Sequence, residues 1–543
     1  MMLLAQALRR LMVIWDQGDL PDFPQDLIRD QIPLVLMQIL HRTLHSQNPD
    51  GSWGKDASVE ESAYALLTVV DASRFPWTQP LDAQAAMAIE KGHGFLSLSC
   101  DRWSEANCIW VAKVSYKSSA LSKTSCIAAI KAASLYPTLY QWTTLANDLV
   151  DTFSEKALKF FSIFADEPKW KLKASLIEGH LFIPRLRRVS LDVFQRKDMT
   201  EDKSLEYIAF TWTICNNRGA FLEADLLRDM MVISMLNFQV DKFMEVLVGA
   251  HDEDQIEQLA QQLSIISAER SSSPPISDDG ASTNFMDGNT LNNGTLTPPL
   301  IGYVSPTILR TVESALSRFS AYILQHPRIT AASHFSRNTL AAHLQAFLLA
   351  HLKHCSERAI FAAQVQNLSP TATPTFAADT TYWEWAHSTG ATNTSCLYFW
   401  AWLTCRLAGG GSHRAPADDD EPFPSVAAKF LAQDMAARLA SMCRMRNDYA
   451  SRARDGADLS LNSVNFPEFE RCGSGRPGKS RRTEPSDMYS RKAALLELAE
   501  FERAGVEAAR TRLLPLVSKR VRAAIGVFVD ATDLYGAYMA TDI

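Results

Sequence analysis

Long apolar runs are absent from this 543-residue sequence, and charge of neither sign dominates it. No stretch of 18 or more consecutive apolar residues occurs, so we expect no membrane-spanning helix. The formal net charge is -7 at pH 7, and no long basic run offsets it. That balance argues against a nucleic-acid-binding protein.

Closely spaced cysteines are also missing, because none of the nine forms a Cys-x-x-Cys pair. Their wide spacing fits reduced thiols better than a zinc site or a disulfide framework: Cys100, Cys108, Cys126, Cys215, Cys355, Cys396, Cys405, Cys443 and Cys472. The apolar stretch 1–15 carries Arg9 and Arg10 and has no cleavage-site pattern. It therefore predicts an amphipathic helix and not a signal peptide, and we expect a cytoplasmic protein.

Strand-like alternation is scarce, whereas apolar residues recur at helical spacing through most of the chain. The clearest helical segments are 145–164, 221–248, 338–354, 427–451 and 491–516. Apolar residues make up 47% of the sequence and charged residues 21%, as in an ordinary globular protein. The sequence thus predicts an all-α fold, long enough for two to four domains.

Three polar stretches interrupt the helical pattern. Residues 271–306 are rich in Ser, Pro, Gly and Asn, so we expect a poorly ordered loop there. Shorter loops are predicted over 408–424 and 472–487. The acids at 418–421 are interpreted as a solvated charge cluster in the second loop.

Three oxygen-bearing side chains, Asn447, Ser451 and Asp455, recur every four residues. At about 100° per residue they would lie on one helix face, and their oxygens suit a hard cation such as Mg²⁺. Arg444 and Arg446 stand just before them, where a phosphate could be clamped. A solvated helix face would give the same spacing, so both interpretations stay open on this stretch alone.

Two carboxylates, Asp241 and Glu245, end a strongly apolar helical run. Burying them is costly unless a cation or donor pairs them. One alternative is a helix end that reaches solvent, with Asp241 paired to Lys242. Taken with the second motif some 200 residues later, the pattern favours a two-sided site for magnesium and a diphosphate within a helical bundle.

At this point several stretches resemble one family, the fungal bifunctional copalyl diphosphate/ent-kaurene synthase type of diterpene cyclase. The matching stretches are QNPDGSWG (47–54), VSYKSSALSKTSCIAAI (114–130), LEYIAFTWTICNN (205–217), DLLRDMMVISMLNFQVDKFME (225–245), RMRNDYASRARDGADLSLNSVNFPEF (444–469) and DATDLYG (530–536). The resemblance implies a class I terpene synthase helical bundle over 136–543. It also implies a partial class II-type helical barrel over 1–135.

The resemblance assigns roles to the two motifs. Asp241 and Glu245 match the first and last acids of the family's aspartate-rich motif. Asn447, Ser451 and Asp455 match its second metal motif, and Arg444 matches the arginine that grips the diphosphate. Mg²⁺ is the implied cofactor, and an allylic prenyl diphosphate is the implied substrate.

Two departures from the family pattern narrow the expected activity. The Asp-x-Asp-Asp acid of the class II reaction occurs nowhere in the sequence, and only 46 residues precede QNPDGSWG. We therefore expect no class II activity. Lys242 stands where the aspartate-rich motif usually has an acid, and Asp455 replaces a more common glutamate.

Three functional hypotheses follow. The first is a monofunctional class I cyclase that takes copalyl diphosphate, or a similar bicyclic diphosphate supplied by a separate class II cyclase. The second acts directly on geranylgeranyl diphosphate. The third is a non-catalytic or truncated remnant of a bifunctional enzyme.

Aromatic side chains are candidates to line a carbocation cavity, although core packing is the commoner role for each of them. They are Trp212, Phe238, Tyr382, Trp383, Trp385 and Tyr398. Within 383–396, Gly390 stands among small hydroxyl residues, a composition that can bend or break a helix, with a simple loop turn as the alternative.

Overall fold

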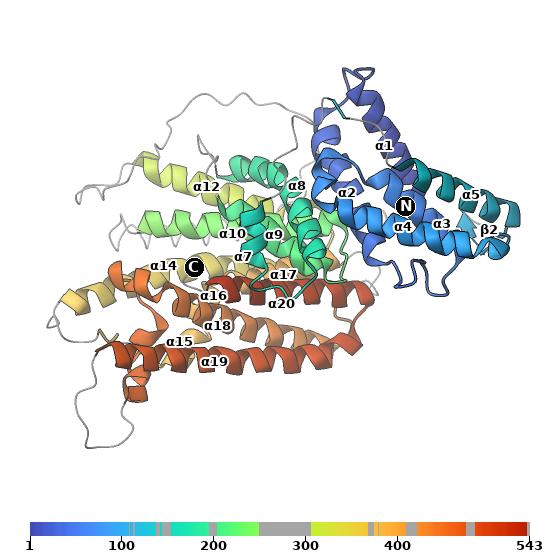
Figure 1. Cartoon of the computed structure of the whole chain (residues 1–543). Helices are drawn as coiled ribbons and strands as arrows, with labels where there is room; N and C mark the ends of the chain where they lie inside the picture. Colours follow the sequence, from blue (N-terminus) through green and yellow to red (C-terminus); the bar gives the residue numbers. More distant parts are fainter. Residues whose placement is uncertain are drawn as a thin grey trace. The chain divides into compact units, whose positions relative to one another are not determined.

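The computed structural model describes residues 1–107, 109–111, 114–136, 142–143, 154–194, 203–248, 306–366, 374–377, 379–408, 421–473 and 484–539. Over these residues the protein is built from helices, with one short antiparallel hairpin of β1 (Ile109–Val111) and β2 (Val114–Tyr116) (Figure 1). The predicted all-α class is confirmed.

The chain forms two compact units. Unit 1 comprises Met1–Arg187 and Asp202–Phe221, and unit 2 comprises Arg188–Glu201 and Leu222–Ile543. Residues 136–187 and 202–221 thus cluster with the N-terminal unit, a division that differs from the predicted boundary at 135/136. The interpretation of the two parts as a barrel remnant and a cyclase domain stays a prediction.

Unit 1 is centred on α3, which packs against α1, α2, α4 and α5. Its helical elements are α1 (Met2–Asp16), η1 (Leu27–Gln31), α2 (Ile32–His45), α3 (Val59–Ala72), η2 (Pro76–Leu81), α4 (Asp82–Leu98), η3 (Cys100–Arg102), α5 (Ser119–Leu135), α7 (Glu155–Phe161), α8 (Lys169–Val193), which continues past the division, and α9 (Lys203–Asn217).

The QNPDGSWG stretch forms the turn between α2 and α3. Trp53 is buried and its indole N–H donates to the carbonyl of Thr43 at 2.8 Å. Gly51 has a φ of +89°, and a Cβ there would stand 2.4 Å from the carbonyl oxygen of Lys91. Glycine is therefore required at that position by both conformation and space.

Unit 2 is a bundle in which α18 packs along α19 and also contacts α16, α17 and α20 (Figure 1). Helix α14 packs against α10, α12, α16 and α17. The elements are α10 (Ala224–Val248), α12 (Pro306–Leu324), α13 (Pro327–Thr330), α14 (His334–Gln366), α15 (Tyr382–Ala386), α16 (Thr389–Thr392), α17 (Cys396–Leu407), α18 (Val426–Ala457), η6 (Ser463–Asn465), η7 (Pro467–Gly473), α19 (Glu484–Leu513), η8 (Leu514–Leu516) and α20 (Lys519–Met539).

The predicted helices 221–248, 338–354, 427–451 and 491–516 correspond to α10, α14, α18 and α19, and α1 matches the amphipathic N-terminal segment. Of the predicted helix 145–164, residues 155–161 form α7 and 162–164 are not helical, whereas 145–153 lie outside the described residues. Two predicted loops extend into helices at their C-terminal ends. The loop 271–306 overlaps α12, which begins at Pro306, and the loop 472–487 overlaps α19, which begins at Glu484 with Pro485 next. Proline favours the first helical turn, where its missing N–H costs nothing. Residues 271–305, 409–420 and 474–483 lie outside the described residues.

Helices long and apolar enough to cross a bilayer were sought over the described residues, and none was found.

Candidate functional site

Asp241 lies in the last two turns of α10, on a helix whose preceding turns are almost wholly buried. Its side chain is 48% exposed, yet its Oδ1 atom is buried and lies 2.9 Å from Nε2 of His351 on α14. The angles of this contact do not meet hydrogen-bond geometry, so both atoms are buried without a hydrogen-bond partner among the described residues. Glu245 and Lys242 belong to the same helix, but their side chains lie outside the described residues.

Tyr398 faces Asp241 from α17. It is fully buried, and burial together with the Asp241 charge raises its pKa well above the usual range. Its ring packs 4.8 Å from that of Phe347, which in turn contacts the His351 ring at 4.6 Å. Among the described residues the Tyr398 hydroxyl has no hydrogen-bond partner. The end of α10 thus lies beside the packed rings of Phe347, His351 and Tyr398, whose Nε2 and hydroxyl groups make no hydrogen bond with the described residues.

The second predicted motif lies on one face of α18, as its spacing predicts. Ser451 Oγ donates to Asp455 Oδ2 at 2.5 Å, and Asn462 Nδ2 donates to the same oxygen at 2.8 Å. Asn447 lies one turn before Ser451 and is partly buried. The three oxygen-bearing side chains are therefore on one side of one helix, and Asp455 is the buried member.

Arg444 is buried one turn before Asn447 and pairs with Asp448 on its own helix. Burial by itself disfavours the arginine cation, but the charge and hydrogen bond of Asp448 outweigh it and raise the Arg444 pKa. Asp448 also accepts from the Ser463 backbone N–H at 2.8 Å and from its hydroxyl at 2.6 Å. The Nε atom of Arg444 is buried without a partner among the described residues.

Arg446 points to a different part of the bundle. Its guanidinium pairs with Asp533 of α20 at 2.9 Å and with Glu500 of α19 at 3.1 Å. Arg503 of α19 shares the Asp533 carboxylate at 2.7 Å. Of the two arginines singled out in the sequence, Arg446 thus links three helices, whereas Arg444 keeps a buried Nε atom without a partner among the described residues.

Helix α14 connects the surroundings of the two motifs, through side chains spaced at i, i+3 and i+6. His351 contacts Asp241, as described above. His354 lies next, with its ring 6.3 Å from that of Trp385, and Glu357 accepts the Trp385 indole N–H at 2.9 Å. The Arg444 guanidinium carbon lies 5.3 Å from the centre of the same Trp385 ring. A chain of contacts therefore runs from Asp241 to Arg444 through one face of α14.

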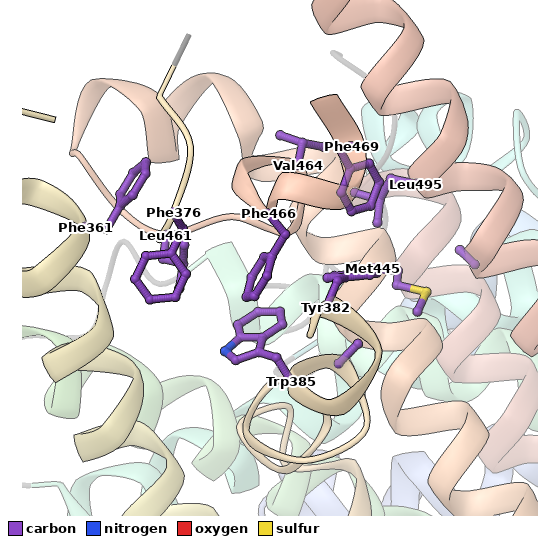
Figure 2. Close-up of a cluster of buried hydrophobic side chains, with 12 residues drawn as sticks. Phe361, Phe376, Tyr382, Trp385, Met445, Leu461, Val464, Phe466, Phe469 and Leu495 are labelled. Carbon is purple, nitrogen blue, oxygen red and sulfur yellow. The ribbon is translucent and has the colours of Figure 1, made fainter. Parts of the chain in front are cut away.

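The candidate aromatic residues divide into separate groups. Tyr382 and Trp385 join a buried cluster with Phe466, and Figure 2 shows the Trp385 ring facing that of Phe466. Trp383 is 68% exposed and stacks on His387, so its interpretation as core is wrong.

Trp212 is a buried residue of unit 1, whereas Phe238 is a partly buried residue of α10 in unit 2. Neither placement tests a contact with a carbocation.

The helix break predicted around Gly390 is confirmed. Helices α15, α16 and α17 are three short pieces in place of one helix, with Ser395 in the left-handed region at φ 62°. A Cβ on Gly390 would stand 3.0 Å from Cζ3 of Trp385 and 3.1 Å from its carbonyl oxygen. Trp385 belongs to the first of these pieces, and from there it contacts Glu357 and Arg444.

The donor set suits Mg²⁺, because the available ligands are hard oxygens of Asp241, Ser451, Asp455 and Asn447. Buried Asp241 Oδ1 lacks a hydrogen bond from the described residues, which fits an atom reserved for a cation. Over those same residues, no three or more His, Cys, Asp or Glu side chains gather closely enough to hold a metal ion by themselves. A metal here would need amide, hydroxyl and phosphate oxygens to complete its shell.

Several residues of this region were missed from the sequence: His351, His354, Glu357, Asp448, Asn462 and Ser463. The i, i+3, i+6 spacing of the α14 residues was a usable signal, since it places all three near one helix face. The role of Asp448 was less visible, because it depends on the fold of 461–465 back onto α18.

Comparison with known proteins finds fungal diterpene synthases along the whole chain. Pimaradiene synthase pbcA of Emericella nidulans is 34% identical over 561 residues, covering 100% of this chain and 54% of that protein. Phyllocladan-16-alpha-ol synthase of Phomopsis amygdali is 28% identical and ent-kaur-16-ene synthase of Fusarium fujikuroi 27% identical, each covering 98% of this chain and 54% of the relative.

The chain therefore spans about half the length of these curated relatives. No protein-family model and no solved structure matches the chain.

Proposed function

We propose that this protein is a class I diterpene cyclase. It ionises a copalyl-type bicyclic diphosphate with the help of Mg²⁺, and it releases diphosphate and a polycyclic diterpene. Relatives over the whole chain are named as diterpene synthases, which supports a terpene synthase activity. The observation that carries the proposal is the Asn447/Ser451/Asp455 face of α18, with buried Arg444 one turn before it.

The metal would be held by Asp241 on α10 and by Asn447, Ser451 and Asp455 on α18, with Glu245 as a further ligand. When bound, Mg²⁺ supplies positive charge that stabilises the departing diphosphate. Asp241 and Asp455 supply the negative charge that keeps such ions in place. The amide and hydroxyl of Asn447 and Ser451 add neutral oxygen donors.

Arg444 contributes a fixed cation beside the second motif. Its partner Asp448 is anchored by Ser463, so the guanidinium is held in one place and needs little reorganisation. Its Nε–H is the donor still available for a phosphate oxygen.

Water must be kept from a carbocation, and the interior faces of α14, α15 and α17 are suited to this. Phe347, Trp385 and Tyr398 are each almost completely buried. Their ring faces are also electron-rich, so they stabilise positive charge without acting as nucleophiles.

The substrate class is inferred from the relatives, which are named as pimaradiene, phyllocladanol and ent-kaurene synthases. A copalyl-type bicyclic diphosphate is the first candidate. Direct use of geranylgeranyl diphosphate is the second candidate. The Asn447/Ser451/Asp455 motif supports this second candidate as well, because geranylgeranyl and copalyl diphosphates are both allylic and ionise in the same way.

The test is to incubate the purified chain with Mg²⁺ and, separately, copalyl and geranylgeranyl diphosphates, and to measure diphosphate release and the hydrocarbons formed. Product from copalyl diphosphate alone supports the proposal, and product from geranylgeranyl diphosphate selects the second candidate. A folded protein that forms no product from either would show a non-catalytic remnant.

A further inference from the structure

We propose that Asn462 is a positioning residue for the second predicted motif. Its side-chain amide fixes one oxygen of the Asp455 carboxylate and leaves the other as the oxygen that binds the cation. This inference rests on the proposed function, in which Asp455 is a metal ligand. It adds a residue that lies outside both motifs, seven positions after Asp455 and beyond the end of α18.

The Asn462 side chain uses its amide nitrogen and its amide oxygen at once. Nδ2 donates to Asp455 Oδ2 and to the backbone carbonyl of Asp448, each at 2.8 Å. Oδ1 accepts from the Val464 backbone N–H at 3.2 Å. These partners fix the orientation of the amide, because a flipped side chain would turn its oxygen toward two acceptors and its nitrogen toward a donor. Asn462 is fully buried, so bulk water does not compete for them.

The two oxygens of Asp455 have different surroundings. Oδ2 accepts from Asn462 and from the Ser451 hydroxyl, the latter at 2.5 Å. Oδ1 makes no hydrogen bond with the described residues, and Nε of Arg454, whose side chain is 70% exposed, lies 3.7 Å from it. Two donors on one oxygen restrict rotation of the carboxylate, so Oδ1 is the oxygen left for a cation. Because the Ser451 proton is directed to Asp455, the lone pairs of its oxygen remain for the same ion.

The turn that carries Asn462 is itself held in place. Leu461 and Val464, on either side of it, are fully buried in the cluster that contains Trp385 (Figure 2). The backbone N–H of Asn462 donates to Asn465 Oδ1 at 3.1 Å. A donor orients a metal ligand only when the donor cannot move, so this support is what the proposed role requires.

Ser463, the next residue, has a different partner. Its backbone N–H and its hydroxyl donate to Asp448 Oδ2, at 2.8 and 2.6 Å. Asp448 pairs with Arg444, so the Ser463 contacts act on the arginine and not on Asp455. Two neighbouring residues of one turn therefore act on different parts of the site, which supplies a matched control.

The test measures how tightly the purified chain binds Mn²⁺, a spectroscopic substitute for Mg²⁺, with and without inorganic diphosphate. The electron paramagnetic resonance signal of the free ion gives the affinity. Asn462→Ser is the main variant, because a serine hydroxyl can cap the turn at Val464 but cannot also reach Asp455. We expect its Mn²⁺ affinity to fall by about 10–100-fold. Ser463→Ala should keep the affinity within about 3-fold, since the hydrogen bond that it removes does not reach a metal ligand.

A second comparison uses a readout that a merely structural role would not move. In an Asp455→Ala background, Asn462→Ser should change the Mn²⁺ affinity no further, because Asn462 acts through that carboxylate. A residue that only stabilised the turn would lower the affinity by the same factor in both backgrounds. Circular dichroism checks the fold of every variant. Asn462→Thr replaces Asn462→Ser if the latter does not fold, since threonine suits the extended backbone at this position.

Three results would overturn the inference and leave the proposed function standing. They are unchanged Mn²⁺ affinity in a folded Asn462 variant, an equal loss with and without the Asp455 carboxylate, and loss of the fold in both Asn462 variants, which would assign the residue to the stability of the turn. An unaltered protein that binds no Mn²⁺, with or without diphosphate, would instead remove the metal site and the proposed function with it.

Discussion

The guanidinium carbon of Arg444 lies 5.3 Å from the centre of the Trp385 ring, and the indole N–H of that ring donates to Glu357 at 2.9 Å. One tryptophan thus contacts both the Arg444 guanidinium, beside the second predicted motif, and a buried carboxylate on α14. Its ring face and its N–H serve different partners, so the two contacts can be separated by substitution.

Trp385→Phe keeps a ring for Arg444 but removes the donor to Glu357. We expect a loss of about 1–3 kcal/mol in the free energy of unfolding, because a buried carboxylate oxygen loses its partner. Chemical denaturation followed by circular dichroism measures it. Trp383→Phe is the control, since Trp383 is exposed and should change stability by less than about 0.5 kcal/mol. Equal effects of the two substitutions would contradict the importance of the Glu357 contact.

Asp241→Asn should leave the fold intact and lower the rate of diphosphate release by about 10²-fold, because a charged metal ligand becomes a neutral one. The Mg²⁺ concentration for half-maximal rate should rise as well. Rate measured against Mg²⁺ concentration tests both effects. Asp225→Asn is the matched control, on the same helix with a largely exposed side chain. Full activity of Asp241→Asn at low Mg²⁺ would remove Asp241 from the metal site.

Gly390→Ala should cost about 1–3 kcal/mol, since its Cβ would be forced against the Trp385 ring and backbone. Thermal unfolding gives the change in Tm. Gly526→Ala in α20 is the control within the same unit, because its Cβ would meet only an ordinary contact at 3.7 Å. That variant should be neutral or slightly more stable, as alanine favours a helix. A Gly390→Ala protein as stable as the control would show that the helix break tolerates side chains.

His354 should make stability fall in acid. Its pKa in the folded protein is lowered, so below about pH 6.5 the unfolded chain takes up a proton that the folded one refuses. Protonation then stabilises the unfolded state relative to the folded state by up to about 1.4 kcal/mol per pH unit, until the pH reaches the pKa of His354 in the folded protein. Tm measured from pH 7 to pH 5 should therefore fall less steeply in His354→Gln than in the unaltered protein. Parallel curves would show that His354 titrates normally.

Local pattern was sufficient to predict the helices that carry the site. The apolar spacing before Asp241 and through 427–451 predicted α10 and α18, because periodic burial is a property of neighbouring residues. The Asn447/Ser451/Asp455 face followed from helix geometry alone. Gly390 among small residues correctly indicated the break before α17.

Partners that come from distant segments could not be predicted in this way. His351 meets Asp241 across 110 positions of sequence, and Ser463 reaches Asp448 only because the chain turns back after α18. Arg444 and Arg446 look equivalent in the sequence, yet one is buried beside Trp385 and the other pairs with α19 and α20. That difference is decided by which helices pack on each side of α18.

The Asp533 carboxylate has a consequence for how the protein can be shortened. It is the shared counter-ion of Arg446 and Arg503, which come from two different helices. A deletion that removed Asp533 would leave two guanidinium groups of like charge near each other, with Glu500 and Glu507 as their remaining acids. Their repulsion would act on α18 one residue before Asn447, so the integrity of the second motif depends on a side chain within the last eleven positions of the chain.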